Sequence, residues 1–423
     1  MVMARSSQLS KELWGVVAIL AVALALRLMW VIIVPTQPVT DFAWYLDRAL
    51  AMARGEGFTV DGVPTAYWPV GYPAVLSWAI RLFPGLDPVS VGKGLNLLLS
   101  LFCVGLTFAV GRSISGRREV GLIAAGILAI HPALVAYSGI LAAEPLFLFL
   151  ILLATWLAIQ GADQPWLWLL VGLTCGGAAL VRPQAAVLPL ILVFGVWVWS
   201  RQRGKSLLPL MAAGLALLGL GAALTPWTLR NRAVYGSTFL VSLNGGDNLW
   251  IGHHPQGNGR YKTPPGIPQN PELELANERA TRAEALSWIR SNPGRSLSLI
   301  PAKWEATFLA TTDLAYWAFQ TQRGKLVIPG AGADKPLYFF TQGAAFWANR
   351  TLLFLALLGV GLGLRHTGGR RFLAVPLLHI GLVALVTAVF FGNPRFGLPA
   401  IPFLALLAAT PWVPADLDEK PRD

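Results

Sequence analysis

Asp41 and the polar residues that follow it in residues 40–49 are the first candidates for chemistry in this sequence. They come a few residues after the apolar run 14–34, which is long enough to cross a membrane. Helical spacing would place Asp41, Tyr45 and Arg48 on one side of a helix. The low dielectric at a membrane face raises the proton affinity of a carboxylate, which suits a general base that accepts the proton of a hydroxyl group. The alternative is that Asp41 only caps a short surface helix.

Glu144 is a second acidic candidate. It begins the apolar run 144–160 and is the only acidic residue between Glu119 and Asp163. An ionisable group at the mouth of an apolar helix indicates a functional site, whereas the alternative is an acidic residue favoured there by the helix dipole. We expect Glu144 to belong to a site.

Arginines follow two other apolar runs. Arg182 precedes Pro183, and Arg230 lies in the sequence Arg230-Asn231-Arg232, shortly after Pro226. Guanidinium groups at membrane depth pair bidentately with phosphate oxygens, so these arginines could hold a phosphate. The alternative is that they extend toward the lipid head groups.

The stretch 244–254 combines a glycine pair, amide side chains and two imidazoles, and it includes Asn244, His253 and His254. Such a loop is suited to cradling a sugar or a phosphate. The two histidines are adjacent and lack the i, i+4 spacing with which one helix presents two metal ligands. We therefore predict no metal site here, and no cofactor is assigned, although a divalent metal is left open.

No nucleotide-binding, zinc-protease or nucleophile-elbow motif is present in the sequence. The sequence thus disfavours an ATP-driven pump and a hydrolase of the soluble type.

The elements that must position these residues are membrane helices. Apolar residues make up 55% of the 423 residues and charged residues 13%, whereas charged residues are about a quarter of a typical soluble domain. Hydropathy predicts an all-α integral membrane protein with about ten transmembrane helices. The corresponding runs are residues 14–34, 88–110, 119–137, 144–160, 166–181, 184–200, 207–225, 346–364, 372–391 and 396–412.

Basic residues indicate the orientation of these helices. With a cytoplasmic N-terminus, four clusters fall on the cytoplasmic side, as the positive-inside rule requires. The formal net charge of +12 is explained by this topology rather than by nucleic-acid binding, because the basic residues do not gather with aromatics on one face. The clusters are Arg112, Arg117 and Arg118; Arg201, Arg203 and Lys205; Arg365, Arg370 and Arg371; and Lys420 and Arg422.

Two outer segments are too long to be simple connections. We predict an N-terminal transmembrane catalytic module at 1–225 with a first outer loop at 35–88, a long outer loop region at 226–345, and C-terminal transmembrane helices at 346–423. Residues 68–83 are apolar but short and rich in proline, so we predict an interfacial or re-entrant helix. Residues 272–289 have helical periodicity, with Asn270 as a cap and a stop at 292–294.

Several short motifs, in this order and spacing, resemble the multi-span glycosyltransferases of the C fold, which include protein O-mannosyltransferases and bacterial lipid A sugar transferases. They extend across nearly the whole chain. The motifs are Asp41 with Tyr45 and Arg48; Tyr67-Trp68-Pro69-Val70-Gly71-Tyr72-Pro73; Glu144-Pro145-Leu146-Phe147; Arg182-Pro183; Pro226-Trp227 with Arg230-Asn231; Asn244-Gly245-Gly246 with Asn248-Leu249-Trp250-Ile251-Gly252; and Arg395-Phe396 before Leu398-Pro399.

The resemblance implies a transferase that moves a hexosyl or pentosyl group from a polyprenyl-phosphate donor to an acceptor hydroxyl at the outer face of the cytoplasmic membrane, facing the periplasm. Asp41 would be the base, Glu144 would assist near the acceptor or an ion, and Arg182 and Arg230 would bind phosphate. Tyr72, Asn231 and Arg395 would contact substrate, with Tyr45, Arg48, Asn244 and His253. The acceptor would be a lipid, a polysaccharide or a protein.

One departure from the family pattern bears on the acceptor. Many protein mannosyltransferases have an acidic pair in the first loop, whereas Asp41 is followed by Phe42. This favours the bacterial branch with lipid or polysaccharide acceptors.

Direct displacement at the anomeric carbon requires one base and positive charge near the departing phosphate, and it inverts the configuration. The main alternative is a polytopic transporter or flippase of lipids or sugars, since charges at the membrane edge also mark substrate pathways. The long outer loop and the absence of internal repeats favour the enzyme.

Overall fold

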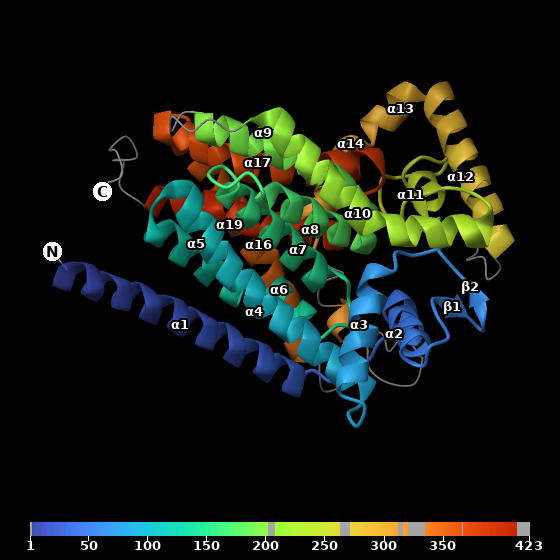
Figure 1. Ribbon diagram of the computed structural model, residues 1–423, viewed down its shortest axis with the longest axis horizontal. Helices are drawn as coiled ribbons and strands as arrows, with labels where there is room; N and C mark the ends of the chain where they lie inside the picture. The colour runs from blue at the N-terminus through green and yellow to red at the C-terminus, as the bar shows by residue number, and fades with distance from the viewer. Residues whose placement is uncertain are drawn as a thin grey trace.

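Long helices, most of them roughly aligned, make up nearly all of the structure (Figure 1). The computed structural model describes residues 2–201, 208–262, 271–311, 316–319, 335–365 and 367–412. Within these ranges the only paired strands form one short hairpin, β1 (Thr59–Val60) with β2 (Val63–Pro64). The expected all-α membrane fold is therefore confirmed.

Six helices among the described residues are long and apolar enough to cross a membrane, and three shorter apolar helices lie beside them. The count of about ten spans is not confirmed. The six are in α1 (Val2–Ile33), α4 (Pro88–Ser115), η1 with α9 (Pro183–Val187 and Leu188–Arg201), α10 (Pro209–Tyr235), α16 (Lys335–Gly363) and α17 (Thr367–Val389). The shorter ones are α7 (Glu144–Gln160), α8 (Leu167–Val181) and the run of α18 (Pro394–Gly397), η3 (Leu398–Ala400) and α19 (Ile401–Ala409).

Two expected spans differ in form from the prediction. The run 119–137 is divided into α5 (Arg118–Ile130) and α6 (Pro132–Tyr137), because Pro132 cannot donate to the helix that precedes it. The run 207–225 continues through Pro226 as α10 and ends at Gly236, whose φ of 62° is a left-handed C-cap.

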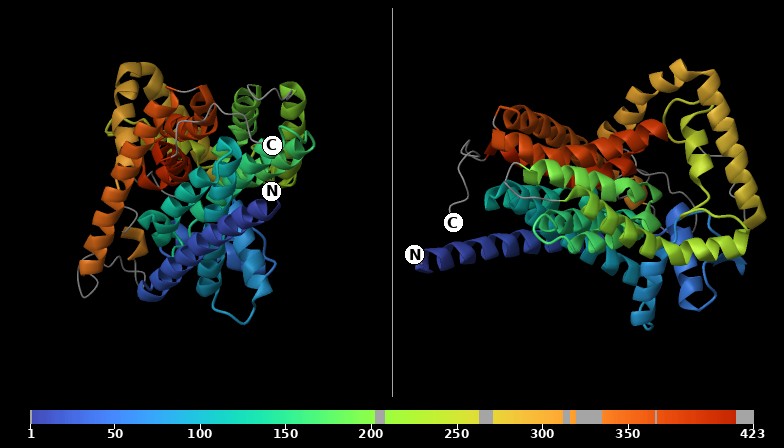
Figure 2. Two further views of the ribbon diagram at one scale, coloured as in Figure 1. Left: turned by 90° about the vertical axis from the view of Figure 1, so that its left-hand side faces the viewer. Right: turned by 45° about the horizontal axis from the view of Figure 1, so that its top comes forward.

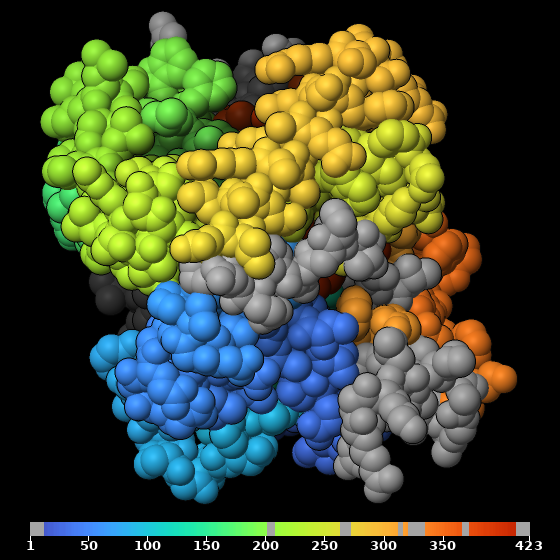
Figure 3. All heavy atoms as spheres, turned by 90° about the vertical axis from the view of Figure 1, so that its right-hand side faces the viewer, coloured from blue at the N-terminus to red at the C-terminus, as the bar shows by residue number. Residues whose placement is uncertain are grey.

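Short helices gather at one end of the bundle, opposite the N-terminal end of α1 (Figures 1 and 2). Residues of the first outer loop form one half of this end, and residues of the second form the other (Figure 3). These elements are α2 (Thr40–Ala53), β1, β2 and α3 (Gly71–Leu82), then α11 (Gly245–Gly252), α12 (Pro271–Ser291), α13 (Pro293–Ser298), α14 (Ile300–Trp304) and the π-helix η2 (Glu305–Leu309). The chain ends its described part with η4 (Thr410–Trp412).

α3 lies across the direction of the long helices and is too short to span, which agrees with the interfacial helix expected at 68–83. α12 agrees with the helix expected at 272–289, and its expected cap Asn270 lies outside the described residues. Arg203, Lys205, Lys420 and Arg422, which the orientation also uses, lie outside them too.

Close packing between helices holds the bundle together, because the hydrophobic effect does not drive helices to associate within lipid. A Cβ atom on Gly172 of α8 would lie 2.0 Å from Ala216 O of α10, and one on Gly219 would lie 2.2 Å from Leu169 O. Small residues of this kind let helix backbones approach within a membrane.

Arg27 fixes α1 to the bundle. Its fully buried guanidinium donates to Ser100 Oγ at 2.7 Å and to the Ala129 carbonyl at 2.9 Å. α5 ends near this carbonyl, so its terminal backbone acceptors are satisfied by a side chain from α1.

Candidate functional site

Asp41 lies in the first turn of α2 and points toward the bundle rather than capping its own helix. The N-cap position is Val39, which has no side-chain cap. The Asp41 carboxylate accepts from Arg395 Nη1 at 2.7 Å and from Thr40 Oγ1 at 2.9 Å, and its side chain is 20% exposed. The carboxylate is therefore held in place and also reachable from outside.

Arg395 joins two acidic side chains from different helices. Nη1 donates to Asp41 Oδ2, and Nε donates to Glu144 Oε1 at 2.8 Å. The guanidinium also lies 4.8 Å from the centre of the Phe42 ring. Arg395 comes from the short helix α18, whose N-cap Asn393 accepts the Arg395 backbone N–H. The turn before α18 therefore decides where this guanidinium points.

Glu144 begins α7 and is nearly buried, with a side chain 3% exposed. Its Oε1 accepts from Arg395 and also from Arg182 Nη2 at 2.5 Å. No hydrogen-bond partner is found for Oε2 in the described structure. We call Asp41, Glu144, Arg182 and Arg395 the charge cluster, which unites residues from α2, α7, the end of α8 and α18.

Two tyrosines lie beside the charge cluster. Tyr45 is buried one turn after Asp41, and its ring centre lies 5.7 Å from that of Tyr72 on α3. Burial, followed by the nearby Asp41 carboxylate, raises the pKa of Tyr45, and burial raises the pKa of Tyr72. Both phenols stay protonated near neutral pH and are suited to donating hydrogen bonds. The accessible base in this group of residues is the Asp41 carboxylate.

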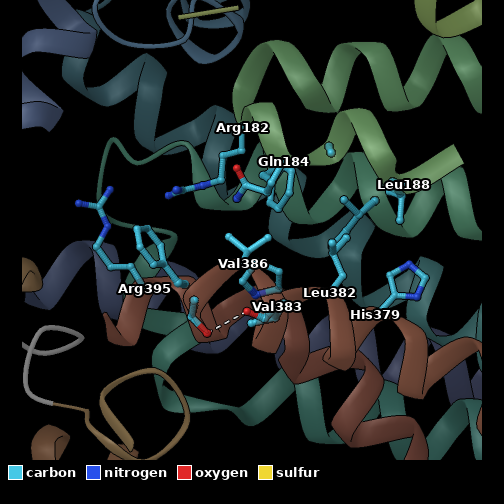
Figure 4. A pocket seen from close by; sticks show the side chains of 14 residues that line it. Arg182, Gln184, Leu188, His379, Leu382, Val383, Val386 and Arg395 are labelled. Atoms are coloured by element: carbon cyan, nitrogen blue, oxygen red, sulfur yellow. Dashed lines mark hydrogen bonds between the residues drawn. The ribbon is translucent and has the colours of Figure 1, made fainter. Parts of the chain in front are cut away.

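An apolar groove leads away from the two arginines. It contains about 540 Å³ of empty space, open solvent included. Arg182 and Arg395 lie at one end, and Leu188 and His379 at the other (Figure 4). The walls between them come from α7, η1, α9 and α17, and they are mostly aliphatic. The groove thus combines a hydrocarbon-like interior with a cationic end.

Arg230 and Asn231 lie on α10, outside the charge cluster. Arg230 donates to the carbonyls of Thr65 and Phe58 at 3.0 and 3.2 Å and lies over the Trp227 ring. The fully buried Asn231 accepts from Arg230. These contacts hold the first outer loop against α10.

Arg48, Asn244 and His253 also lie outside the charge cluster. Arg48 lies 5.4 Å from the Trp44 ring centre, and burial lowers the pKa of Arg48. Asn244 accepts from Ser242 Oγ at 2.9 Å. His253 faces the buried Lys303.

Sequence reasoning did not single out two buried acids that join the outer loops. Glu274 of α12 accepts from Thr65 Oγ1, the Ala66 N–H and Tyr235 Oη. Asp247 of α11 accepts from Tyr67 Oη at 2.6 Å and from Asn277 Nδ2 at 3.1 Å. For Glu274, the available signal was its helical spacing with Glu278 and Thr281, which places the three on one face of the helix.

In the part of the chain that the structure describes, no three His, Cys, Asp or Glu side chains come close enough to hold a metal ion. The acids of the charge cluster are instead paired with arginines.

The chain is similar to one protein family model and to solved archaeal structures. Residues 72–227 match the family model of dolichyl-phosphate-mannose-protein mannosyltransferases. No curated protein sequence matches the chain. Archaeal oligosaccharyltransferase AglB from Archaeoglobus fulgidus, in complex with an inhibitory peptide and a dolichol-phosphate, aligns with a TM-score of 0.56 and 13% identity over 95% of this chain and 50% of that chain. The apo oligosaccharyltransferase of the same organism aligns with a TM-score of 0.54 and 13% identity, over 93% of this chain and 50% of that one.

The chain has the glycosyltransferase C fold. It spans about half the length of the archaeal C-fold structures that it matches. The segment matched by the family model contains Tyr72, Glu144 and Arg182, whereas Asp41 and Arg395 lie outside it.

Proposed function

We propose that this protein is a membrane glycosyltransferase that moves a sugar from a polyprenyl-phosphate donor to an acceptor hydroxyl. The observation that carries the proposal is the charge cluster at the end of the apolar groove, since it joins a base, two arginines and a hydrocarbon-like channel. The match to the mannosyltransferase family model supports it.

The groove suits the donor lipid. A polyprenyl chain requires an apolar channel that is open to the membrane, and its phosphate requires cations at the end of that channel. Arg182 and Arg395 provide these cations, and the aliphatic residues of α17, with Ile151 and Leu188, provide the channel. The dolichol-phosphate in the matched archaeal structure is consistent with this assignment.

The charge cluster suits an inverting displacement. Asp41 accepts the proton of the acceptor hydroxyl while the hydroxyl oxygen forms a bond with the anomeric carbon. The bond from that carbon to the phosphate oxygen breaks, and its electron pair leaves with the polyprenyl phosphate. Arg182 and Arg395 stabilise the negative charge on the departing phosphate.

Donor binding also prepares the base. Arg395 Nη1 donates to the Asp41 carboxylate in the structure. A bound phosphate competes for the same N–H groups, so the Asp41 carboxylate is released toward the acceptor. Glu144, which holds both arginines through Oε1, keeps them at the groove during this exchange.

The transferred group is a hexosyl or pentosyl unit, and the acceptor is a lipid, a polysaccharide or a protein. The site is assigned to the outer face of the cytoplasmic membrane, with a cytoplasmic N-terminus, because the basic residues between α4 and α5 lie at the opposite end of the bundle.

The decisive experiment is sugar transfer by purified protein in lipid, with a panel of labelled polyprenyl-phosphate sugars and simple alcohol acceptors. Asp41→Asn should lower turnover by at least about a hundredfold while the carrier still binds, because the amide cannot accept the proton and both arginines remain. Asp47→Asn is the matched control, since Asp47 is an exposed acid on the same helix.

Turnover by Asp41→Asn at the wild-type rate would overturn Asp41 as the base. Tight carrier binding by the wild type without transfer from any donor would instead favour the transporter function.

A further inference from the structure

The end of α17 is held by two buried side chains from the second outer loop. Lys303 of α14 is fully buried, and its Nζ lies 2.9 Å from the Ala388 carbonyl oxygen. His253, which follows α11, places Nε2 2.8 Å from the Val389 carbonyl oxygen and 3.1 Å from Lys303 Nζ. The last carbonyls of a helix have no partner within the helix, so these two side chains satisfy them.

The turn that leaves α17 is enclosed on several sides. A Cβ atom on Gly252 would lie 1.8 Å from Phe390 O, and one on Gly392 would lie 2.2 Å from Lys303 O. On the far side of Arg395, a Cβ atom on Gly397 would lie 2.3 Å from Thr307 O. The backbone on both sides of Arg395 is therefore seated directly against α11, α14 and η2.

The hydrogen-bond geometry indicates which protons are present. A carbonyl oxygen only accepts, so His253 Nε2 must carry the hydrogen that it donates to Val389 O. Nε2 then has no lone pair for Lys303, and a protonated ammonium would direct N–H against N–H. A neutral Lys303 avoids this conflict, because its Nζ donates to Ala388 O and can turn its lone pair, rather than an N–H group, toward His253.

We propose that Lys303 and His253 are positioning residues for Arg395: they fix the end of α17 and thereby the turn from which Arg395 reaches Asp41 and Glu144. We call these contacts of Lys303 and His253 with the end of α17 the lock. The effect of the lock on catalysis rests on the proposed function, but the lock itself is a property of the fold. Neither residue is bonded to the charge cluster among the contacts described, so both act through the backbone of residues 389–395.

The protonation of Lys303 makes the lock dependent on pH. Burial lowers the pKa of Lys303 to about 8, and burial followed by the charge of Lys303 lowers the pKa of His253. Between this pKa and the ordinary lysine pKa of about 10.4, closing the turn releases a proton from Lys303. A higher pH therefore favours the closed turn within that range. Arg260, whose backbone pairs with Gly392, forms an ion pair with Glu305, two residues after Lys303.

The test uses Lys303→Met, which keeps an unbranched side chain without the amine, and His253→Phe, which keeps an aromatic ring without the Nε2 donor. Lys262→Met is the control, because Lys262 is an exposed lysine of the same loop. The first readout is hydrogen exchange of residues 389–397 in the full-length protein in detergent. Both test variants should exchange faster there than the wild type and the control.

The second readout is the binding of decaprenyl phosphate. Both test variants should bind it about tenfold more weakly or worse, since a small displacement of a positioned group has effects of this size. Between about pH 7 and about pH 9, binding should strengthen more for the wild type and Lys262→Met than for Lys303→Met. Ionisation of the carrier phosphate is common to all variants and cancels in this comparison.

Unchanged exchange at 389–397 in both test variants would overturn the proposal, as would a pH dependence of binding that Lys303→Met retains in full. If the wild type does not bind decaprenyl phosphate but both test variants exchange faster at 389–397, the lock would be supported and the proposed function would be overturned.

Discussion

Arg395 holds two carboxylates that are more than a hundred residues apart in sequence, Asp41 and Glu144. Burying such ion pairs costs desolvation energy that their attraction only partly returns, so they contribute little net stability. Arg182 adds a second cation to the same Glu144 oxygen rather than to the free one. This arrangement is more readily understood as preparation for a ligand's negative charge than as a device for stability.

The fork of Arg395 gives a prediction at the scale of single residues. Arg395→Lys should lower transfer by about a hundredfold, because the single nitrogen of lysine cannot occupy both positions from which Nη1 and Nε donate to Asp41 and Glu144. Turnover and carrier binding by the purified variant would measure this. Arg118→Lys, at an exposed ion pair, is the control. Equal turnover by the two variants would contradict the role given to the fork.

Sequence reasoning named all four members of the charge cluster as site residues, and the structure brings them together. It could not show their pairing, because contacts between α2, α7 and α18 depend on tertiary packing. Helical spacing grouped Arg48 with Asp41, but Arg48 packs on Trp44 instead. Their roles in catalysis stay predictions.

At the scale of elements, the first outer loop is fastened to the second by buried acids. Glu274 of α12 binds Thr65 and Ala66 of the first loop and Tyr235 at the end of α10. The periodicity of residues 272–289 predicted this helix correctly. It could not show which glutamate is buried, because the helix contains several glutamates. Glu274 is 1% exposed, whereas Glu284 on the same helix is exposed.

This fastening gives a second prediction. Glu274→Gln should destabilise the outer loops by about 2 kcal/mol, because its amide would present a donor to the Ala66 N–H or leave one acceptor too few. Hydrogen exchange of residues 58–67 should accelerate, as measured by mass spectrometry. Glu284→Gln should leave this exchange unchanged. Identical exchange in both variants would show that the Glu274 contacts do not hold the loop.

Helix boundaries were the least predictable part of the elements. Hydropathy ends a span where polar residues begin, but α10 continues through Pro226 to Tyr235, and α16 begins at Lys335 rather than near residue 346. A helix that leaves the membrane can remain helical when its side chains find partners. For α10 these partners are the carbonyls bound by Arg230 and Trp227.

At the scale of the whole molecule, the two ends of the bundle differ in content. The charge cluster and short helices lie at one end, and the basic turn with Arg117 and Arg118 lies at the other, where α4 meets α5. The overall fold class followed from hydropathy alone, because apolar runs of spanning length leave few soluble alternatives. Which end faces outward depends on the positive-inside rule.

Site-directed labelling tests this orientation. Cys103 and Cys175 are both buried, so the native background for a thiol reagent should be low. Glu284→Cys lies at an exposed position of α12 in the second outer loop. Gln164→Cys lies at an exposed position between α7 and α8, at the opposite end of α7 from Glu144. A membrane-impermeant maleimide added to intact cells should label Glu284→Cys, whereas Gln164→Cys should react only after the membrane is opened.

The reverse labelling pattern would place Asp41 on the cytoplasmic side, and both the donor and the acceptor would then have to be reconsidered. Labelling at both positions in intact cells would mean that the reagent had crossed the membrane, which a cytoplasmic marker protein with a free thiol would reveal.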